Sequence, residues 1–120
     1  MEPALRDGDV AILCRFGRPS VGDIVILRGS GKERLVKRVI ALAGDEVALA
    51  EDGVLWVNGQ PEARGQTRAA QNGVDFPCRV PAGCLFLLGD NRSASLDSRR
   101  LGPIPQKQII GRVIWVIGRR

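Results

Sequence analysis

The sequence contains no histidine and no tyrosine, and aromatic residues make up only 4% of its 120 positions. Without histidine there is no Ser-His-Asp triad, no HExxH zinc site and no histidine general base. The scarcity of aromatic rings also argues against a platform on which single-stranded nucleic acid stacks. A hydrolase of this composition is left with paired carboxylates, or with a serine, threonine or cysteine activated by lysine.

Long apolar runs are also missing. No run approaches the roughly 18 residues that span a bilayer, and no charged-then-apolar leader precedes the first strand-like segment. The net charge of +5 comes mostly from arginine and suits nucleic acid or an anionic membrane surface. The basic residues are scattered singly, however, so we expect a solvated basic surface and no nucleic-acid partner. The length and the 44% hydrophobic content predict one globular domain, residues 1–120.

Cysteine is scarce as well, with Cys14, Cys78 and Cys84 the only three. Three thiols without histidine form neither a four-thiolate nor a mixed zinc site. Structural thiols are the default interpretation, and a disulfide between Cys78 and Cys84 in an oxidising compartment stays open as the alternative. We expect no metal and no cofactor.

Short segments rich in Val, Ile and Leu, bounded by Gly, Asp, Asn and Pro, predict strands. They cover residues 10–16, 23–28, 33–42, 46–50, 54–57, 84–88 and 109–117. Four Gly-Asp dipeptides indicate turns, and helix is limited to a turn or two within 95–102 and 103–110. The polar stretch at about 58–77 predicts an exposed excursion. The expected fold is all-β, a folded sheet or barrel with very little helix.

The chain has only three lysines: Lys32, Lys37 and Lys107. The first and last lie in polar, turn-like contexts. In a strand through RLVKRVIAL, the side chain of Lys37 shares one face with Leu35, Val39 and Ala41. A lysine held among apolar neighbours loses solvation and its pKa falls, which is what a lysine general base requires. The alternative is an edge strand on which Lys37 points to water.

Residues 89–102, GDNRSASLDSRRLG, concentrate charge and hydroxyl groups in one loop. Asp97 and Arg99, two residues apart, can form a charge-assisted hydrogen-bonded pair. Such a pair can hold the loop rigid and fix the hydroxyls of Ser93, Ser95 and Ser98. The alternative is a solvated polar turn.

Several segments together resemble the type I signal peptidase family, including its mitochondrial inner-membrane relatives. They are MEPALRDGDVAIL, GDIVIL, KRVIALAGDEV followed by VNG, and VPAGCLFLLGDNRSASLDSRRLGPIPQKQIIGRV. The first segment also resembles LexA-like autoproteases, which use the same dyad. The GDNRxxSxDSRxxGP segment belongs to the signal peptidases and favours them.

The resemblance implies a Ser-Lys dyad on a β fold, without a metal or cofactor. Lys37 falls on the general base, and Ser95 on the serine that orients it. Asp97 and Arg99 fall on a supporting ion pair, and Asp90 and Arg38 on a second one. The loop would therefore pack charge and hydroxyls together to position one lysine.

The resemblance also implies the substrate, the N-terminal signal peptides of preproteins, cut after small residues in an Ala-x-Ala pattern. Met1, Leu5 and Val36 fall on apolar positions that line the pockets for these residues. The segment GDIVIL and the strand that carries Lys37 resemble the walls along which an extended signal peptide lies as an added strand. The implied location is the plasma membrane, with the catalytic domain on the extracytoplasmic face and an anchor upstream of Met1.

The start of the sequence departs from the family motif Ser-Met-x-Pro-Thr-Leu, whose serine is the nucleophile. Here the chain begins Met1-Glu2-Pro3-Ala4-Leu5, so the nucleophile would stand one residue before Met1. We therefore expect the chain as written to be inactive. Two interpretations remain open: a protein that starts upstream, or a non-catalytic binder of signal-like or pilin-like segments.

Overall fold

The structure is a computed structural model that describes residues 10–15, 17–29, 34–50, 54–66, 76–89 and 98–117. The strands are β1 (Val10–Cys14), β2 (Ile24–Arg28), β3 (Arg34–Ala41), β4 (Glu46–Leu49), β5 (Val54–Val57), β6 (Gln60–Gln66), β7 (Cys78–Arg79), β8 (Cys84–Leu88), β9 (Ile104–Pro105) and β10 (Ile109–Ile117). Helix is confined, in these ranges, to α1 (Ser98–Leu101) and the 3-10 turn η1 (Gln106–Gln108). The all-β prediction is confirmed, and both short helical turns lie inside the ranges predicted for them.

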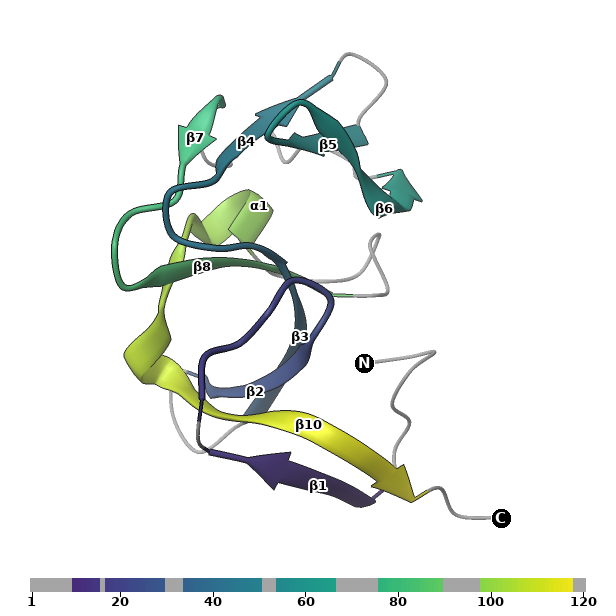
Figure 1. The fold of residues 1–120 in the computed structure, drawn as a ribbon. Helices are drawn as coiled ribbons and strands as arrows, with labels where there is room; N and C mark the ends of the chain where they lie inside the picture. Colours follow the sequence, from purple (N-terminus) through teal and green to yellow (C-terminus); the bar gives the residue numbers. More distant parts are fainter. Residues whose placement is uncertain are drawn as a thin grey trace.

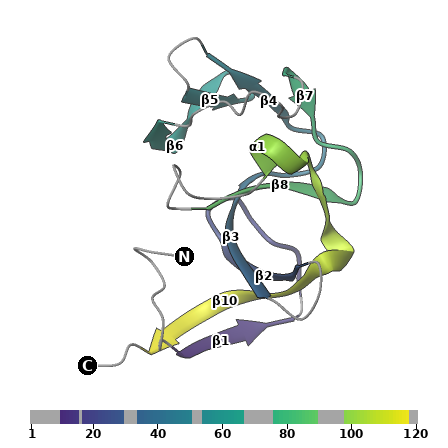
Figure 2. The same ribbon diagram turned by 180° about the vertical axis from the view of Figure 1, so that it is seen from behind.

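The strands form two sheets. The larger has six strands in the order β1-β10-β2-β3-β8-β9, and the smaller has four in the order β6-β5-β4-β7. All their pairings are antiparallel in the described ranges. In Figure 1 the larger sheet curves round through β8, β3, β2 and β10, and the smaller sheet lies beyond β8. Figure 2, from behind, shows α1 between β8 and the smaller sheet.

The buried apolar residues form two cores. The first core lies between the sheets and consists of Ile40, Ala41, Val47, Leu55, Val80, Phe86 and Leu88. The second lies within the curved larger sheet and consists of Val25, Leu27, Val39, Leu85, Leu87 and Ile104. Because β3 and β8 supply residues to both, these two strands connect the two cores.

Two of the predicted Gly-Asp turns are visible and share one geometry. Asp23 N–H donates to Ser20 O (3.0 Å), and Gly22 has a φ of 96°. A positive φ at the third position defines a type II turn and favours glycine there. The Asp23 carboxylate accepts from the Ser20 N–H at 2.8 Å, which closes the turn a second time. The turn ending at Asp45 repeats this arrangement, with Leu42 N–H donating to its carboxylate at 2.8 Å.

The polar segment 58–77 differs from the predicted excursion. Its first part forms β6, which pairs with β5 through the two-residue turn Asn58-Gly59. Both turn residues have positive φ, 50° and 80°, and Asn-Gly is the dipeptide that such a hairpin turn prefers. The turn chemistry thus extends the sheet into a segment whose side chains are mostly polar.

Candidate active site

Lys37 lies in the middle of β3 and is partly buried. Its register partner on β2 is Val25, which is fully buried. Leu35 and Val39, two residues away on either side, belong to the core within the larger sheet. Since side chains of a strand alternate between faces and paired residues share one, Lys37 is on the face of this core. Lys37 therefore shares a face with Leu35 and Val39, and β3 is an inner strand of its sheet.

Ala41 does not share that face, contrary to the sequence prediction. The register of β3 with β8 runs Val39↔Leu87 and then Ala41↔Phe86, so Ile40 is an extra residue in the strand. Such a β-bulge resets the alternation. Ile40 and Ala41 consequently both contribute to the core between the sheets. The apolar face around Lys37 ends at Val39.

Among the described residues, the first part of β3 has a strand partner on one side only. β8 pairs with β3 from Arg38 onward, and within the described ranges no strand pairs with residues 34–36 on the side away from β2. A strand edge of this kind offers its backbone N–H and C=O groups to an extended peptide. Val36, the substrate-pocket residue expected from the sequence, is partly buried on this stretch and faces away from Lys37.

Arg38 projects to the opposite face from Lys37. Its Nη1 donates to the Gly22 carbonyl at 2.8 Å, so the type II turn before β2 holds the guanidinium. The same face borders a cleft of about 470 Å³ between β3 and the β5–β6 hairpin. The residues lining the cleft include Val21, Arg38, Asp45, Asn58 and Glu62. The role of Gly22 as an acceptor was not predicted, although its turn was.

Most of the loop residues expected at the site lie outside the described residues. These are Asp90, Ser95 and Asp97, together with the pocket residues Met1 and Leu5. The pairing of Asp90 with Arg38 and that of Ser95 with Lys37 therefore stay predictions. Arg99 is in α1, but its side chain is also outside the described part, so its pairing with Asp97 stays a prediction as well.

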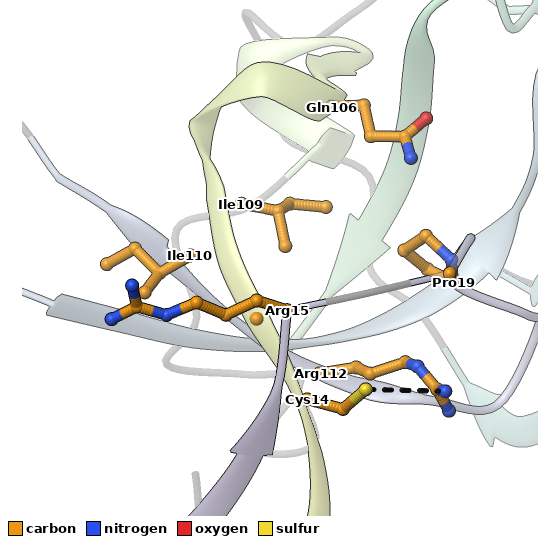
Figure 3. Close-up of a pocket in the computed structure, with 9 residues that line it drawn as sticks. Cys14, Arg15, Pro19, Gln106, Ile109, Ile110 and Arg112 are labelled. Atoms are coloured by element: carbon orange, nitrogen blue, oxygen red, sulfur yellow. Dashed lines mark hydrogen bonds between the residues drawn. The ribbon is translucent and has the colours of Figure 1, made fainter.

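A second hollow, of about 140 Å³, lies where β1 and β10 meet. Arg112 Nη2 donates to the Cys14 Sγ at 3.8 Å, and Arg15 lines the same hollow. Figure 3 shows the side chains of Arg15 and Arg112 pointing in opposite directions. The two guanidinium groups do not converge on one ligand, and none of the expected active-site residues that the structure describes lines this hollow.

All three cysteines are free thiols, so the structure does not contain the Cys78–Cys84 disulfide that the sequence left open. Burial raises the pKa of the Cys78 thiol above its ordinary value of 9.0. A thiol that resists ionisation is a poor nucleophile. The free thiol and its raised pKa fit a structural role for Cys78.

The decisive comparison is with the profile of the family described as "Signal peptidase, peptidase S26", which matches residues 1–117. The chain belongs to this signal peptidase family. The match includes the strand of Lys37 and residues 89–102, and it favours the signal peptidases over the LexA-like alternative.

Individual relatives agree with the family match. A "Signal peptidase I" of Bacillus caldolyticus is 36% identical over 132 residues, which cover 94% of this chain and 71% of the relative. A "Probable thylakoidal processing peptidase 2, chloroplastic" of Arabidopsis thaliana is 37% identical over 128 residues, 96% of this chain but 35% of the relative. Relatives with these names support signal peptidase I function for the chain.

A solved structure is similar in fold. The crystal structure of a signal peptidase I from Enterococcus faecalis V583 has a TM-score of 0.62 and 28% sequence identity, and the similarity covers 82% of this chain and 98% of that one. Signal peptidases I are membrane-associated. Across the described ranges of this chain, no helix has the length and apolar character needed to cross a membrane.

Proposed function

We propose that residues 1–120 form the single catalytic domain of a type I signal peptidase and that Lys37 is its general base. The observation that carries the proposal is the position of Lys37 on the core face of β3. Its neighbours there, Val25 and Val39, are fully buried. An amine in this setting is poorly solvated, which favours its neutral form. A neutral amine can take a proton from a serine hydroxyl near neutral pH.

The chemistry then follows the Ser-Lys pattern of the family. The amine of Lys37 removes the proton of the nucleophilic serine, whose oxygen attacks the carbonyl carbon of the scissile peptide bond. The ammonium returns that proton to the departing amine, leaving an acyl-serine. In the second half, Lys37 takes a proton from water, and the hydroxide oxygen attacks the acyl carbon. The ammonium then returns the proton to the departing serine oxygen, which regenerates both groups. The family motif puts the serine one residue before Met1.

The open edge of β3 supports the substrate assignment. A signal peptide in an extended conformation would pair with the backbone of residues 34–36 and bring its carbonyl groups toward Lys37. We propose Val36, Met1 and Leu5 as apolar pocket residues that select small side chains by excluding larger ones. This accounts for cleavage after an Ala-x-Ala sequence.

We propose that Ser95 orients the amine of Lys37, and that the Asp97–Arg99 and Asp90–Arg38 pairs brace the loop. Arg38 supports this role because it follows Lys37 on β3 and its guanidinium is already fixed, with Nη1 donating to the Gly22 carbonyl at 2.8 Å. A braced loop would keep the serine hydroxyl within hydrogen-bond reach of the amine.

The proposed place of action is the extracytoplasmic face of the plasma membrane. Exposed apolar side chains on β1 and β10 support contact with a membrane surface. Ile12 on β1 is 45% exposed and Ile114 on β10 is 52% exposed, and these two strands pair at one end of the larger sheet. Exposed apolar groups on neighbouring strands suit a lipid interface better than water.

The test uses the chain extended at its N-terminus by Gly-x-Ser, with an Ala-x-Ala preprotein as substrate. We expect cleavage, and we expect Lys37→Ala to lower its rate by more than about 1000-fold, as removal of a dyad member does. Lys107→Ala is the matched control, since Lys107 is an exposed lysine on η1. Cleavage that survives Lys37→Ala would sink the assignment.

A further inference from the structure

Ser98 is a buried polar residue that is hydrogen-bonded to β8, the strand that pairs with the strand of the proposed base. It is the first residue of α1 and is fully buried, with 0% of its side chain exposed. Its Oγ accepts a hydrogen bond from the backbone N–H of Leu87 at 2.9 Å. Its own carbonyl accepts from Gly102 N–H at 2.9 Å, which closes the single turn of α1. Both polar ends of the residue are therefore fixed in place.

The N–H of Leu87 has no acceptor on the neighbouring strand β3. Leu87 pairs with Val39, whose N–H donates to Asp23 O (2.8 Å) and whose carbonyl accepts from Gly22 N–H (2.9 Å). Both polar groups of Val39 thus point away from β8. In such a non-hydrogen-bonded antiparallel pair, the N–H of Leu87 points outward from β3 as well.

The next strand outward does not reach Leu87 either. β9 pairs with β8 only at Cys84 and Leu85. The hydroxyl of Ser98 takes the place that a longer β9 would have, and it satisfies a buried donor that would otherwise be costly to leave unpaired. This explains why a serine stands at a fully buried position.

The same hydrogen bond fixes the start of α1 on the strand that pairs with the strand of the proposed base. β8 ends at Leu88, which is the register partner of Arg38, the residue that follows Lys37 in β3. Eleven residues after Leu87 the chain returns at Ser98 and bonds back to that residue. The start and the end of the intervening segment are thus tied to one place on β8, next to the strand of Lys37.

We propose that Ser98 is a positioning residue for the Lys37 site, whose hydroxyl fixes the return point of the segment that follows β8. This inference rests on the proposed function, because it treats Lys37 as the base. If Ser98 is purely structural, its replacement should change the stability of the protein alone. If it is a positioning residue, its replacement should also change the solvent exposure and the position of the Lys37 amine.

The 120-residue chain itself allows the test, because the reactivity of an amine needs no nucleophilic serine. Each lysine is labelled by reductive methylation across about pH 6 to pH 11 and followed by mass spectrometry. Exposed Lys107 is the internal reference. Described side chains that share the face of Lys37 are apolar, namely Val25, Leu35 and Val39, so we expect Lys37 to become reactive at a lower pH than Lys107.

Ser98→Ala is expected to move the profile of Lys37 toward that of Lys107 by about one pH unit. Val47→Ala is the matched control, since Val47 is fully buried in the other core and lies on β4, a strand of the smaller sheet that pairs with neither β3 nor β8. We expect it to leave the Lys37 profile unchanged. If the alanine variant does not fold, Ser98→Cys decides, because a thiol has nearly the same size and accepts hydrogen bonds weakly.

The outcomes separate the two proposals. If Lys37 and Lys107 have the same profile in the unaltered chain, the assignment of Lys37 as the base fails. If Lys37 is shifted, but the folded Ser98 variant keeps its profile or Val47→Ala moves it equally, the positioning role of Ser98 is overturned. A shift in the Ser98 variant alone supports it.

Discussion

Truncation of Val25 tests whether the β2 neighbour sets the environment of Lys37. Val25 is fully buried and is the register partner of Lys37. Val25→Ala removes two methyl groups, about 1.6 kcal/mol of transfer free energy, and leaves a cavity. With the cavity included, we expect a loss of about 2–3 kcal/mol in the free energy of unfolding. Val47→Ala deletes the same atoms at an equally buried site in the other core and should cost a similar amount.

The two variants should differ at Lys37. A cavity beside Lys37 admits water to its amine, so Val25→Ala should move its methylation profile upward by about half a pH unit, and Val47→Ala should not. Urea denaturation measures the stability of each variant, and the labelling assay measures the amine. Equal movement of Lys37 in both variants would refute the reasoning about its neighbour. A loss below about 0.5 kcal/mol for Val25→Ala would refute the argument from burial.

Two further predictions concern the smaller sheet. Asn58→Ala should cost about 2 kcal/mol, measured by urea denaturation, because Asn58 has a φ of 50° and its side chain bonds Glu46 N–H and the Asp45 carboxylate, each at 2.9 Å. Asn58→Gly should cost less, since it keeps the turn geometry and loses only these bonds. For Cys78, the raised pKa means that the folded state retains a proton that the unfolded state loses, so this contribution to stability is present below about pH 9 and falls as pH rises further. Denaturation at pH 8 and pH 10 should show this fall, and a Cys78→Ala variant with an undiminished fall would contradict it.

The strands that the sequence predicts are those whose burial follows directly from local pattern. β2, β3, β8 and β10 carry runs of β-branched and aliphatic residues that suit a half-buried or fully buried pleated surface. β7 and β9 have two residues each, and so short a pairing depends on a partner strand that no local pattern reveals. β6 was missed because its residues are polar, although Asn58-Gly59 carried the signal for its hairpin.

The apolar setting of Lys37 could be predicted because it needs only the two-residue period of one strand. The face of β3 on which Ala41 lies could not be predicted, because the extra residue Ile40 arises from the pairing of β3 with β8. The anchoring role of Ser98 also escaped, since it depends on which N–H groups of β8 remain unpaired after β3 and β9 are in place. Periodicity reports the faces of an isolated strand, whereas bulges and capping hydroxyls depend on its neighbours.

The alternation of β3 suggests why its lysine and arginine are adjacent in sequence. Lys37 faces the core of the larger sheet, and Arg38 faces the cleft beside the β5–β6 hairpin, where it donates to Gly22 at 2.8 Å. Consecutive residues of a strand point to opposite faces, so one short segment can hold an amine among apolar side chains and a permanent cation in a polar setting. Exchanging the two would bury the guanidinium, which keeps its charge, at a site that suits an amine able to become neutral. If Lys37 is the proposed base, the order Lys-Arg is a requirement of the site, and the reverse order should abolish preprotein cleavage by the chain extended with Gly-x-Ser, without changing the composition of the strand.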